Sequence, residues 1–291
     1  MTKSVLLKSE TTEVEVALYG AEPMAWRVGG TELFWQADAS IWGRTSPILF
    51  PVVGRTRGGE ITVHGRPYPM APHGFIASHE FSIVAQSESS VTLAAADNAE
   101  THKSYPFPFH IEVRYDVGPG RCSVTFVVRN PGPDSLPYAL GFHPGFRWPF
   151  AGGDKGSYAL VFDQEEEPMA SVLNKEGFLA PTKVAVPMDG YRLPLSDALV
   201  SQGALCFLNL NSRRVRFIAQ NGSTIELRSE NFPHLALWGK TDAPFACIEP
   251  WTGYSDPEGF AGDITEKPSI CLVESGCEAR HKLDMTFWAT K

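Results

Sequence analysis

Residues 110–130 read HIEVRYDVGPGRCSVTFVVRN, and this stretch decides the fold class of the chain. Its two halves, HIEVRYDV and RCSVTFVVRN, are rich in Val, Ile, Thr and aromatic residues, which favour the extended backbone of a pleated sheet. Gly118, Pro119 and Gly120 separate the halves, and glycine adopts the positive φ angles of tight turns at little cost. The stretch therefore predicts a β-hairpin.

Segments of the same kind recur on both sides of this hairpin, at residues 14–18, 90–94, 215–219 and 224–227. The last two flank Asn221-Gly222, the preferred centre of a type I′ turn, so we expect a second tight hairpin there. Helical periodicity is nearly absent, because Gly or Pro interrupts every stretch of about 12 residues that has the apolar spacing of a helix. We predict an all-β protein in which residues 1–291 form one large, mostly antiparallel β-sandwich domain.

Composition narrows the function classes. The 25 basic and 33 acidic residues give a formal net charge of −8, and a net acidic surface argues against nucleic acid as a partner. With 43% apolar residues the chain can bury a large core, which excludes disorder of the whole chain. No apolar run approaches the ~18 residues that span a bilayer, and the N-terminus lacks the apolar core of a secretory signal. We therefore expect no membrane association and a cytoplasmic location.

The chain also lacks the motifs of several other classes. It has no GxGxxG after a strand, no GxxxxGK[ST], no GxSxG and no HExxH, so nucleotide-binding, serine-hydrolase and zinc-protease functions have no support. Its five cysteines are scattered and form no CxxC pair: Cys122, Cys206, Cys247, Cys271 and Cys277. We expect reduced thiols that pack as small apolar groups, and no metal site.

Two segments in the first quarter of the chain carry residues that suit ligand binding. Residues 47–55 (PILFPVVGR) end at Arg55, whose guanidinium suits the oxygens of a ligand or, equally, a surface ion pair. Residues 68–75 (YPMAPHGF) place His73 on irregular backbone after a proline-containing turn. A lone histidine of this kind is more often structural than functional.

Two later segments combine a titratable side chain with aromatic rings. Residues 139–148 (ALGFHPGFRW) place His143 beside Phe142; aromatic rings next to a polar donor suit a sugar, and a satisfied core histidine is the alternative. Residues 245–253 (FACIEPWTG) embed Glu249 among apolar residues, two positions before Trp251. Burying a carboxylate is costly unless it is paired or functional, and burial would raise its pKa from about 4.3 and strengthen it as a base.

Taken in order, five pieces of the chain resemble the aldose 1-epimerase, or galactose mutarotase-like, family, and within it the LacX-type branch: ILFPVVGR (48–55), HGRPY (64–68), HGF (73–75), GFHPGF (141–146) and CIEPWTGYSD (247–256). The resemblance implies the family's fold, a large twisted antiparallel β-sandwich of the galactose mutarotase-like supersandwich type, with the sugar in a cleft on one face. It also implies that Glu249 is the general base and His143 the general acid. The remaining substrate-binding residues would be His73, Arg55, Trp251, Phe142 and Asp256.

Two positions depart from the family pattern. Gly145 stands where the family often has tyrosine, which removes an aromatic wall and would widen the pocket. The aspartate that holds a ring hydroxyl has two possible matches, Asp242 and Asp256. The family also includes members that act on hexose 6-phosphates, so the expected substrate is an aldohexose or its phosphate.

The resemblance implies an isomerase that interconverts sugar anomers without a cofactor. Two other classes stay open: a carbohydrate-binding protein that uses the same cleft without turnover, and a polysaccharide hydrolase or lyase. A glycosidase would need a second carboxylate about 5–10 Å from the first, and the motifs offer one evident candidate. We expect a monomer or a homodimer, the latter formed through an exposed strand edge.

Overall fold

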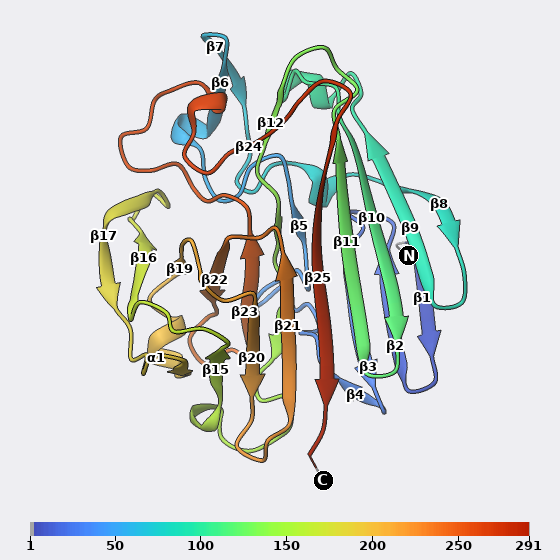
Figure 1. The fold of residues 1–291 in the computed structure, drawn as a ribbon, viewed down its shortest axis with the longest axis vertical. Helices are drawn as coiled ribbons and strands as arrows, with labels where there is room; N and C mark the ends of the chain where they lie inside the picture. Colours follow the sequence, from blue (N-terminus) through green and yellow to red (C-terminus); the bar gives the residue numbers. More distant parts are fainter. Residues whose placement is uncertain (1–2, 291) are drawn as a thin grey trace.

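The computed structural model describes residues 3–290 and consists mainly of antiparallel β-sheets (Figure 1). The largest sheet has nine strands, in the order β18 (Arg192–Pro194), β15 (Ala159–Phe162), β20 (Arg214–Ile218), β21 (Thr224–Glu230), β25 (Glu278–Trp288), β11 (Arg121–Arg129), β10 (His110–Gly118), β9 (Ser90–Ala96) and β8 (Ser82–Gln86). This arrangement confirms the all-β antiparallel sandwich predicted from the sequence.

An eight-stranded sheet carries the residues of the candidate site. Its order is β17 (Leu179–Ala185), β16 (Met169–Leu173), β19 (Leu205–Phe207), β22 (His234–Trp238), β23 (Phe245–Trp251), β13 (Gly141–Phe142) and β5 (Ile48–Leu49), and β14 (Gly145–Arg147) also pairs with β23. A four-stranded sheet near the N-terminus contains β1 (Ser4–Ser9), β2 (Thr12–Ala17), β3 (Pro23–Val28) and β4 (Thr31–Glu32). Two small two-stranded sheets pair β6 (Glu60–Val63) with β7 (Arg66–Pro69) and β12 (Leu136–Tyr138) with β24 (Cys271–Val273).

Strands β10 and β11 form the hairpin predicted for residues 110–130. Their register ends at Gly118 opposite Arg121, so Pro119 and Gly120 make a two-residue loop in which Gly120 has φ 68°. The second hairpin, β20–β21, is also present, but its turn differs from the expected type I′. A type I′ turn needs a positive φ at both central residues, but of Asn221 and Gly222 only Gly222, at φ 85°, adopts the left-handed conformation. A single left-handed glycine at this position is typical of a three-residue loop.

Alternating burial along the long strands builds the core. Ile111, Val113, Tyr115 and Val117 of β10 are buried, and so are Leu283 and Met285 of β25, whereas the residues between them are at least partly exposed. Strand β23 is buried along its whole length. Ala246 and Ile248 face the sandwich core, while Cys247, Glu249 and Trp251 point to the opposite side of the sheet because strand side chains alternate. That opposite side forms the floor of the candidate site.

The helical segments are all short: α1 (Asp197–Val200) and the 3₁₀ turns η1 (Arg57–Gly59), η2 (Ile76–Ser78), η3 (Thr101–Lys103), η4 (Lys155–Ser157) and η5 (Ile264–Glu266). Within residues 3–290 no helix has the length and apolar character needed to cross a membrane. All five cysteines are free thiols, as the sequence analysis expected, and three of them are buried.

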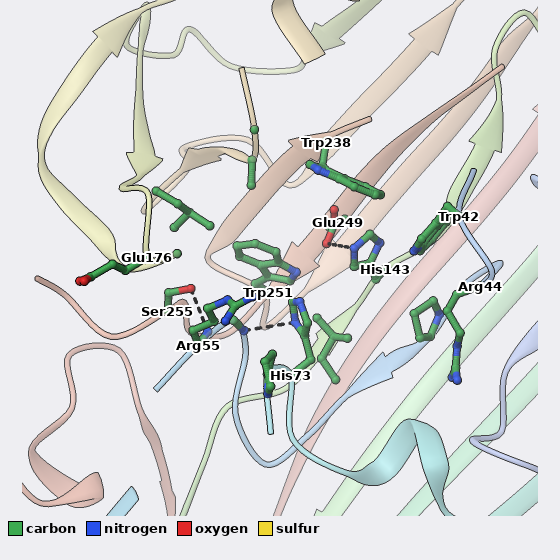
Figure 2. A pocket seen from close by; sticks show the side chains of 18 of the residues that line it. Trp42, Arg44, Arg55, His73, His143, Glu176, Trp238, Glu249, Trp251 and Ser255 are labelled. Atoms are coloured by element: carbon green, nitrogen blue, oxygen red, sulfur yellow. Dashed lines mark hydrogen bonds and ion pairs between the residues drawn. The ribbon is translucent and has the colours of Figure 1, made fainter. Parts of the chain in front are cut away.

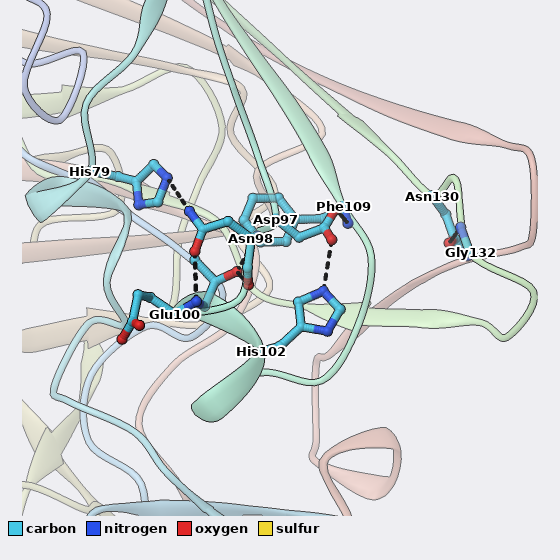
Figure 3. A network of polar contacts seen from close by, with 9 residues as sticks. His79, Asp97, Asn98, Glu100, His102, Phe109, Asn130 and Gly132 are labelled. Carbon is cyan, nitrogen blue, oxygen red and sulfur yellow. Dashed lines mark hydrogen bonds and ion pairs between the residues drawn. The ribbon is translucent and has the colours of Figure 1, made fainter.

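The loop after β9 is held by a network of side-chain contacts (Figure 3). Asn98 accepts hydrogen bonds from the backbone N–H groups of Glu100 and Thr101, and Asp97 accepts one from the Phe109 N–H. The Asp97 carboxylate also contacts His102 Nε2 at 2.7 Å. These bonds satisfy backbone donors of a surface turn, so the network has a structural role.

Candidate active site

A cavity of about 950 Å³ opens on the side of the eight-stranded sheet that faces away from the core (Figure 2). Strands β22 and β23 form its floor through Trp238, Glu249 and Trp251, and four connecting segments, around residues 42–55, 72–77, 173–177 and 202–204, form its walls. The volume lies at the upper end of the range typical of small-molecule sites. The cavity is therefore large enough for a sugar-sized ligand that carries a substituent.

Glu249 lies on the cavity floor and is only 1% exposed. Burial raises the pKa of its carboxyl well above the ordinary value, because the charged form loses its hydration, and the nearby Trp251 side chain acts in the opposite direction. A buried carboxyl of this kind holds its proton more readily than a surface glutamate does. A carboxyl whose pKa is shifted in this way in a cavity is a candidate for proton transfer.

His143 lies between β13 and β14 and reaches the same floor. Its backbone N–H donates to Pro47 O at 3.0 Å, and its Nε2 lies 3.3 Å from Glu249 Oε2. Trp42 stacks on the imidazole with ring centroids 5.0 Å apart, and Trp238 meets it edge-on at 5.6 Å. Figure 2 shows His143 between Glu249 and Trp42.

The surroundings of His143 and Glu249 favour a state in which the pair is uncharged. Burial lowers the pKa of His143 well below its usual value, with a further contribution from His73, and burial raises the pKa of Glu249. At 3.3 Å the two groups are close enough to titrate as a coupled pair, with one proton on either side chain, although these two atoms make no hydrogen bond with each other. The pair can accordingly take up one proton and release another without a change in its total charge.

A hydrogen bond from the backbone fixes the orientation and the tautomer of the His73 ring. The Gly54 N–H donates to His73 Nδ1 at 3.2 Å, and because a backbone N–H only donates, Nδ1 carries no proton. The remaining proton of the neutral ring is then on Nε2, which is a donor. Burial and the charge of Arg55 lower the pKa of His73 to about 4, so this neutral form is maintained at neutral pH.

The backbone at His73 is held in an unusual conformation. His73 has φ 65° and Gly74 has φ 74°, and a Cβ at Gly74 would lie 2.1 Å from Phe50 O. Only glycine fits at position 74, since any side chain would overlap the Phe50-Pro51 backbone. The His-Gly step noted in the sequence is therefore a steric requirement of the site.

Arg55 lies exposed at the rim and is positioned by its backbone. Its N–H donates to Ser255 Oγ at 3.1 Å, and its carbonyl accepts from the Asp256 N–H at 2.9 Å. A Cβ at Gly177 would lie 2.5 Å from Arg55 Cδ, so the turn after β16 packs directly on the guanidinium stem. These contacts direct the Arg55 side chain along the cavity wall.

The structure brings five of the seven predicted site residues to the cavity and leaves two outside it. Glu249, His143, His73, Arg55 and Trp251 line the cavity. The prediction for Phe142 is corrected, because its ring is fully buried in the core against Phe126; it precedes His143 in the chain and points to the other side of the sheet.

The prediction for Asp256 is corrected as well. Its carboxylate is 5% exposed, accepts from the Arg57 N–H at 2.8 Å and pairs with buried Lys267 at 2.7 Å. It faces a second, smaller cavity of about 300 Å³ rather than the sugar-sized one. Asp256 therefore holds the chain at residues 55–57 and acts on the site only through Arg55. Asp242, the other possible match, is also absent from the lining of the larger cavity.

Sequence reasoning missed the aromatic wall that Trp42 provides. A Cβ at Gly145 would lie 2.7 Å from the Trp42 ring, so Trp42 fills the space that a tyrosine at 145 would take, and the pocket is not widened as expected. The segment that carries Trp42 is anchored by buried Glu22, which accepts from the N–H groups of Thr45 and Ser46 and pairs with Arg44. No local pattern around Trp42 indicates this placement. Sequence reasoning also missed Trp238 on the cavity floor, which directly follows the apolar strand residues LAL.

With this geometry established, comparison with known proteins identifies the family. The aldose 1-epimerase family model matches residues 3–272. The chain belongs to the aldose 1-epimerase family. This result confirms the resemblance drawn from the five sequence pieces, and family membership supports a sugar-epimerase role.

Individual relatives agree with the family assignment. The chain is 28% identical to the plasmid-encoded protein LacX of Lactococcus lactis subsp. lactis over 97% of this chain and 99% of that protein. Among solved structures it is similar to a galactose mutarotase related enzyme from Lactobacillus acidophilus, with TM-score 0.93, 27% identity and coverage of 99% and 98% of the two chains. A galactose mutarotase-like protein from Lactobacillus casei gives TM-score 0.92 and 27% identity, with coverage of 98% and 100%.

Proposed function

We propose that the protein is an aldose 1-epimerase that interconverts the α and β anomers of an aldohexose or its phosphate. The observation that carries this proposal is the 3.3 Å contact between His143 Nε2 and Glu249 Oε2 on the floor of a cavity walled by tryptophans. Tryptophan rings suit the C–H faces of a pyranose, and the two titratable groups suit its hemiacetal oxygens.

The reaction needs one proton removed and one delivered. Glu249 takes the proton of the anomeric hydroxyl while His143 gives one to the ring oxygen, and the C1–O5 bond breaks to leave an aldehyde. Rotation about C1–C2 presents the other carbonyl face, and the ring recloses with the two proton transfers reversed. Because both oxygens are bonded to C1, an acid and a base that touch each other can reach them together.

The proton balance of the pair fits this cycle. Ring opening starts from carboxylate and imidazolium, and it ends with the carboxylic acid and neutral imidazole that burial of the pair favours. Ring closure restores the starting arrangement, so no proton has to enter from solvent during turnover. Glu249 and His143 therefore end each turnover in the protonation states in which they began it.

The other residues of the cavity would position the sugar. His73 offers an Nε2 proton to a hydroxyl, Arg55 offers guanidinium donors at the rim, and Trp251 supplies an apolar face. Arg55, Lys175 and Lys240 also line the cavity, against the two carboxylates of Glu176 and Glu249, while Arg44, which lines it too, pairs with Glu22. This excess of positive charge is why the proposed substrate class includes hexose phosphates.

The test is anomer exchange measured by polarimetry or NMR after dissolving pure α-D-glucose, α-D-galactose and their 6-phosphates. We expect the protein to accelerate exchange of at least one of them, and Glu249→Gln to lower the enzymatic rate by about 10²–10⁴-fold. The matched control is Asp97→Asn, which removes a carboxylate that contacts a histidine outside the cavity and should leave the rate unchanged. A fully active Glu249→Gln variant would refute the assigned base.

The alternative from the sequence analysis, sugar binding without turnover, loses part of its basis because Trp42 fills the space beside Gly145. Calorimetry distinguishes it from catalysis. Binding of a sugar by the wild-type protein without accelerated anomer exchange would favour the alternative.

A further inference from the structure

Cys247 lies beneath the cavity wall, next to the proposed acid and base. It is two residues before Glu249 on β23, so both side chains point to the same side of the sheet. The thiol is fully buried and packs among aromatic residues that include Trp35 and Phe245. One ligand atom each of His143, Cys247 and Glu249 lies within 4.8 Å of the other two.

Two polar atoms of this cluster are unsatisfied. Across residues 3–290 neither Glu249 Oε2 nor His143 Nδ1 has a hydrogen-bond partner, although Glu249 is 1% exposed. Buried polar atoms without protein partners are rare, and a bound ion, an ordered water or a reactive role accounts for them in native proteins. The proposed substrate would contact these groups only transiently.

The spacing of the three ligand atoms fits a tetrahedral metal ion. Two ligands each about 2.0–2.1 Å from Zn²⁺ at the tetrahedral angle lie about 3.3 Å apart. The His143 Nε2 to Glu249 Oε2 distance is 3.3 Å. A thiolate at about 2.3 Å from the same ion would lie about 3.6 Å from the other two ligand atoms. Because these atoms lie within 4.8 Å of one another, the sulfur completes the set after a movement of at most about 1.2 Å.

We propose that His143 Nε2, Cys247 Sγ and Glu249 Oε2 form a Zn²⁺ site, and that Zn²⁺ bound there inhibits the protein. A mixed sulfur, nitrogen and oxygen donor set selects Zn²⁺, and its analogues Co²⁺ and Cd²⁺, over Mg²⁺ or Ca²⁺. On binding, the thiol and any protonated carboxyl release their protons to solvent, and the metal takes the lone pairs that would otherwise move protons to and from the sugar. The binding claim is independent of the proposed function; only the inhibition rests on it.

The binding test uses Co²⁺ as a spectroscopic probe on the chelator-treated, full-length protein in a phosphine reductant. We expect a thiolate-to-cobalt charge-transfer band in the near ultraviolet and tetrahedral d–d bands in the visible, both removed when Zn²⁺ is added. Cys247→Ala should abolish the charge-transfer band and weaken Zn²⁺ binding in calorimetry by more than the roughly 10–100-fold that loss of an outer-shell partner costs. Cys277→Ser is the matched control, because this exposed thiol lies outside the cluster and its loss should leave the band intact.

Anomer exchange supplies the second readout. Zn²⁺ should inhibit the wild-type protein and Cys277→Ser at equal concentrations, and Cys247→Ala should resist inhibition by about 10-fold or more. If Cys247→Ala does not fold, Glu249→Gln replaces it in the binding test, where the same loss of Zn²⁺ affinity is expected. A missing charge-transfer band, or a band that survives in Cys247→Ala, overturns the site. If Zn²⁺ binds but anomer exchange is unchanged or faster, the claim of inhibition is overturned. If the protein has no exchange activity, the proposed function and the inhibition both fail, and the cobalt spectrum decides the binding claim by itself.

Discussion

Two contacts in this protein each bring an imidazole against a carboxylate, but one lies at the surface and the other is buried. The His102–Asp97 contact, on the loop after β9, is 2.7 Å long, and its side chains are 40% and 25% exposed. The His143–Glu249 contact is longer, at 3.3 Å, but its side chains are 11% and 1% exposed. Distance alone would rank the surface contact first. Burial, however, raises the pKa of Glu249 and lowers the pKa of His143, whereas water screens the electrostatic interaction between His102 and Asp97 at the surface.

The largest expected difference between the two contacts is catalytic. His143→Asn should lower kcat/KM for anomer exchange by about 10²–10⁴-fold, because the ring oxygen loses its proton donor. His102→Asn should leave kcat/KM unchanged within error, since His102 lies on the loop after β9 and does not line the cavity. The measurement is initial rates by polarimetry on both variants. Equal losses in the two variants would mean that the cleft pair has no special role.

A second difference lies in the backbone that frames the cleft. Gly74→Ala should cost about 3 kcal/mol of unfolding free energy, because its Cβ would meet Phe50 O at 2.1 Å at a φ of 74°. Gly59→Ala has a similar φ of 70° but nothing within 4 Å of its Cβ, so it should cost about 1 kcal/mol. Urea unfolding of both variants separates steric overlap from backbone strain. Equal costs would show that the close approach at Gly74 is relieved by a small shift.

The third prediction concerns stability against pH. Because burial raises the pKa of Glu249, the folded protein keeps a proton that the unfolded chain releases above about pH 4.5. The stabilising contribution of this group is present below that pH and is lost as pH rises through the folded pKa, by up to about 1.4 kcal/mol per pH unit. Glu249→Gln should therefore be more stable than wild type by about 1–2 kcal/mol at pH 8, with a smaller gap at pH 5.

His143 contributes with the opposite sign in both proteins. Its lowered pKa makes the unfolded chain bind more protons below about pH 6.5, so its contribution is lost as pH falls toward the folded pKa. Asp97→Asn should bring no gain at pH 8, since Asp97 accepts from the Phe109 N–H and pairs with His102. Denaturant unfolding at both pH values provides the test, and a Glu249→Gln gap that is the same at pH 5 and pH 8 would contradict it.

The sequence predicted what local chemistry determines. The β10–β11 hairpin follows from strand-forming residues on both sides of Pro119-Gly120, and Glu249 stood out as a carboxylate in an apolar strand. The sequence could not give the direction of a side chain in an irregular segment. Phe142 and His143 are neighbours that point to opposite sides of the sheet, and the carboxylate of Asp256 turns under the chain at Arg57.

Long-range placement was the other limit. Trp42 reaches His143 across about 100 residues of sequence, through a segment that Glu22 anchors and past a glycine that leaves it space. Gly145 was interpreted as a lost wall because the residue that replaces the wall is distant in sequence. Whether a residue distant in sequence fills the space beside a glycine can be seen only when the packing is known.

Trp42 also gives the smallest and most specific prediction. Its stacking on His143 is worth about 0.5–1.5 kcal/mol, so Trp42→Ala should lower kcat/KM about 2–10-fold, and Trp42→Phe should recover part of the loss. Removing the ring also admits water to one face of His143, which should raise its pKa toward the ordinary value and make it resemble His102, as an NMR titration of the two imidazoles would show. Trp288→Ala, at an exposed end of β25, is the control and should change neither quantity. If the pKa of His143 is the same in Trp42→Ala as in the wild type, the tryptophan does not cause the difference in pKa between the two histidines. The strands beneath the imidazole would then be its cause.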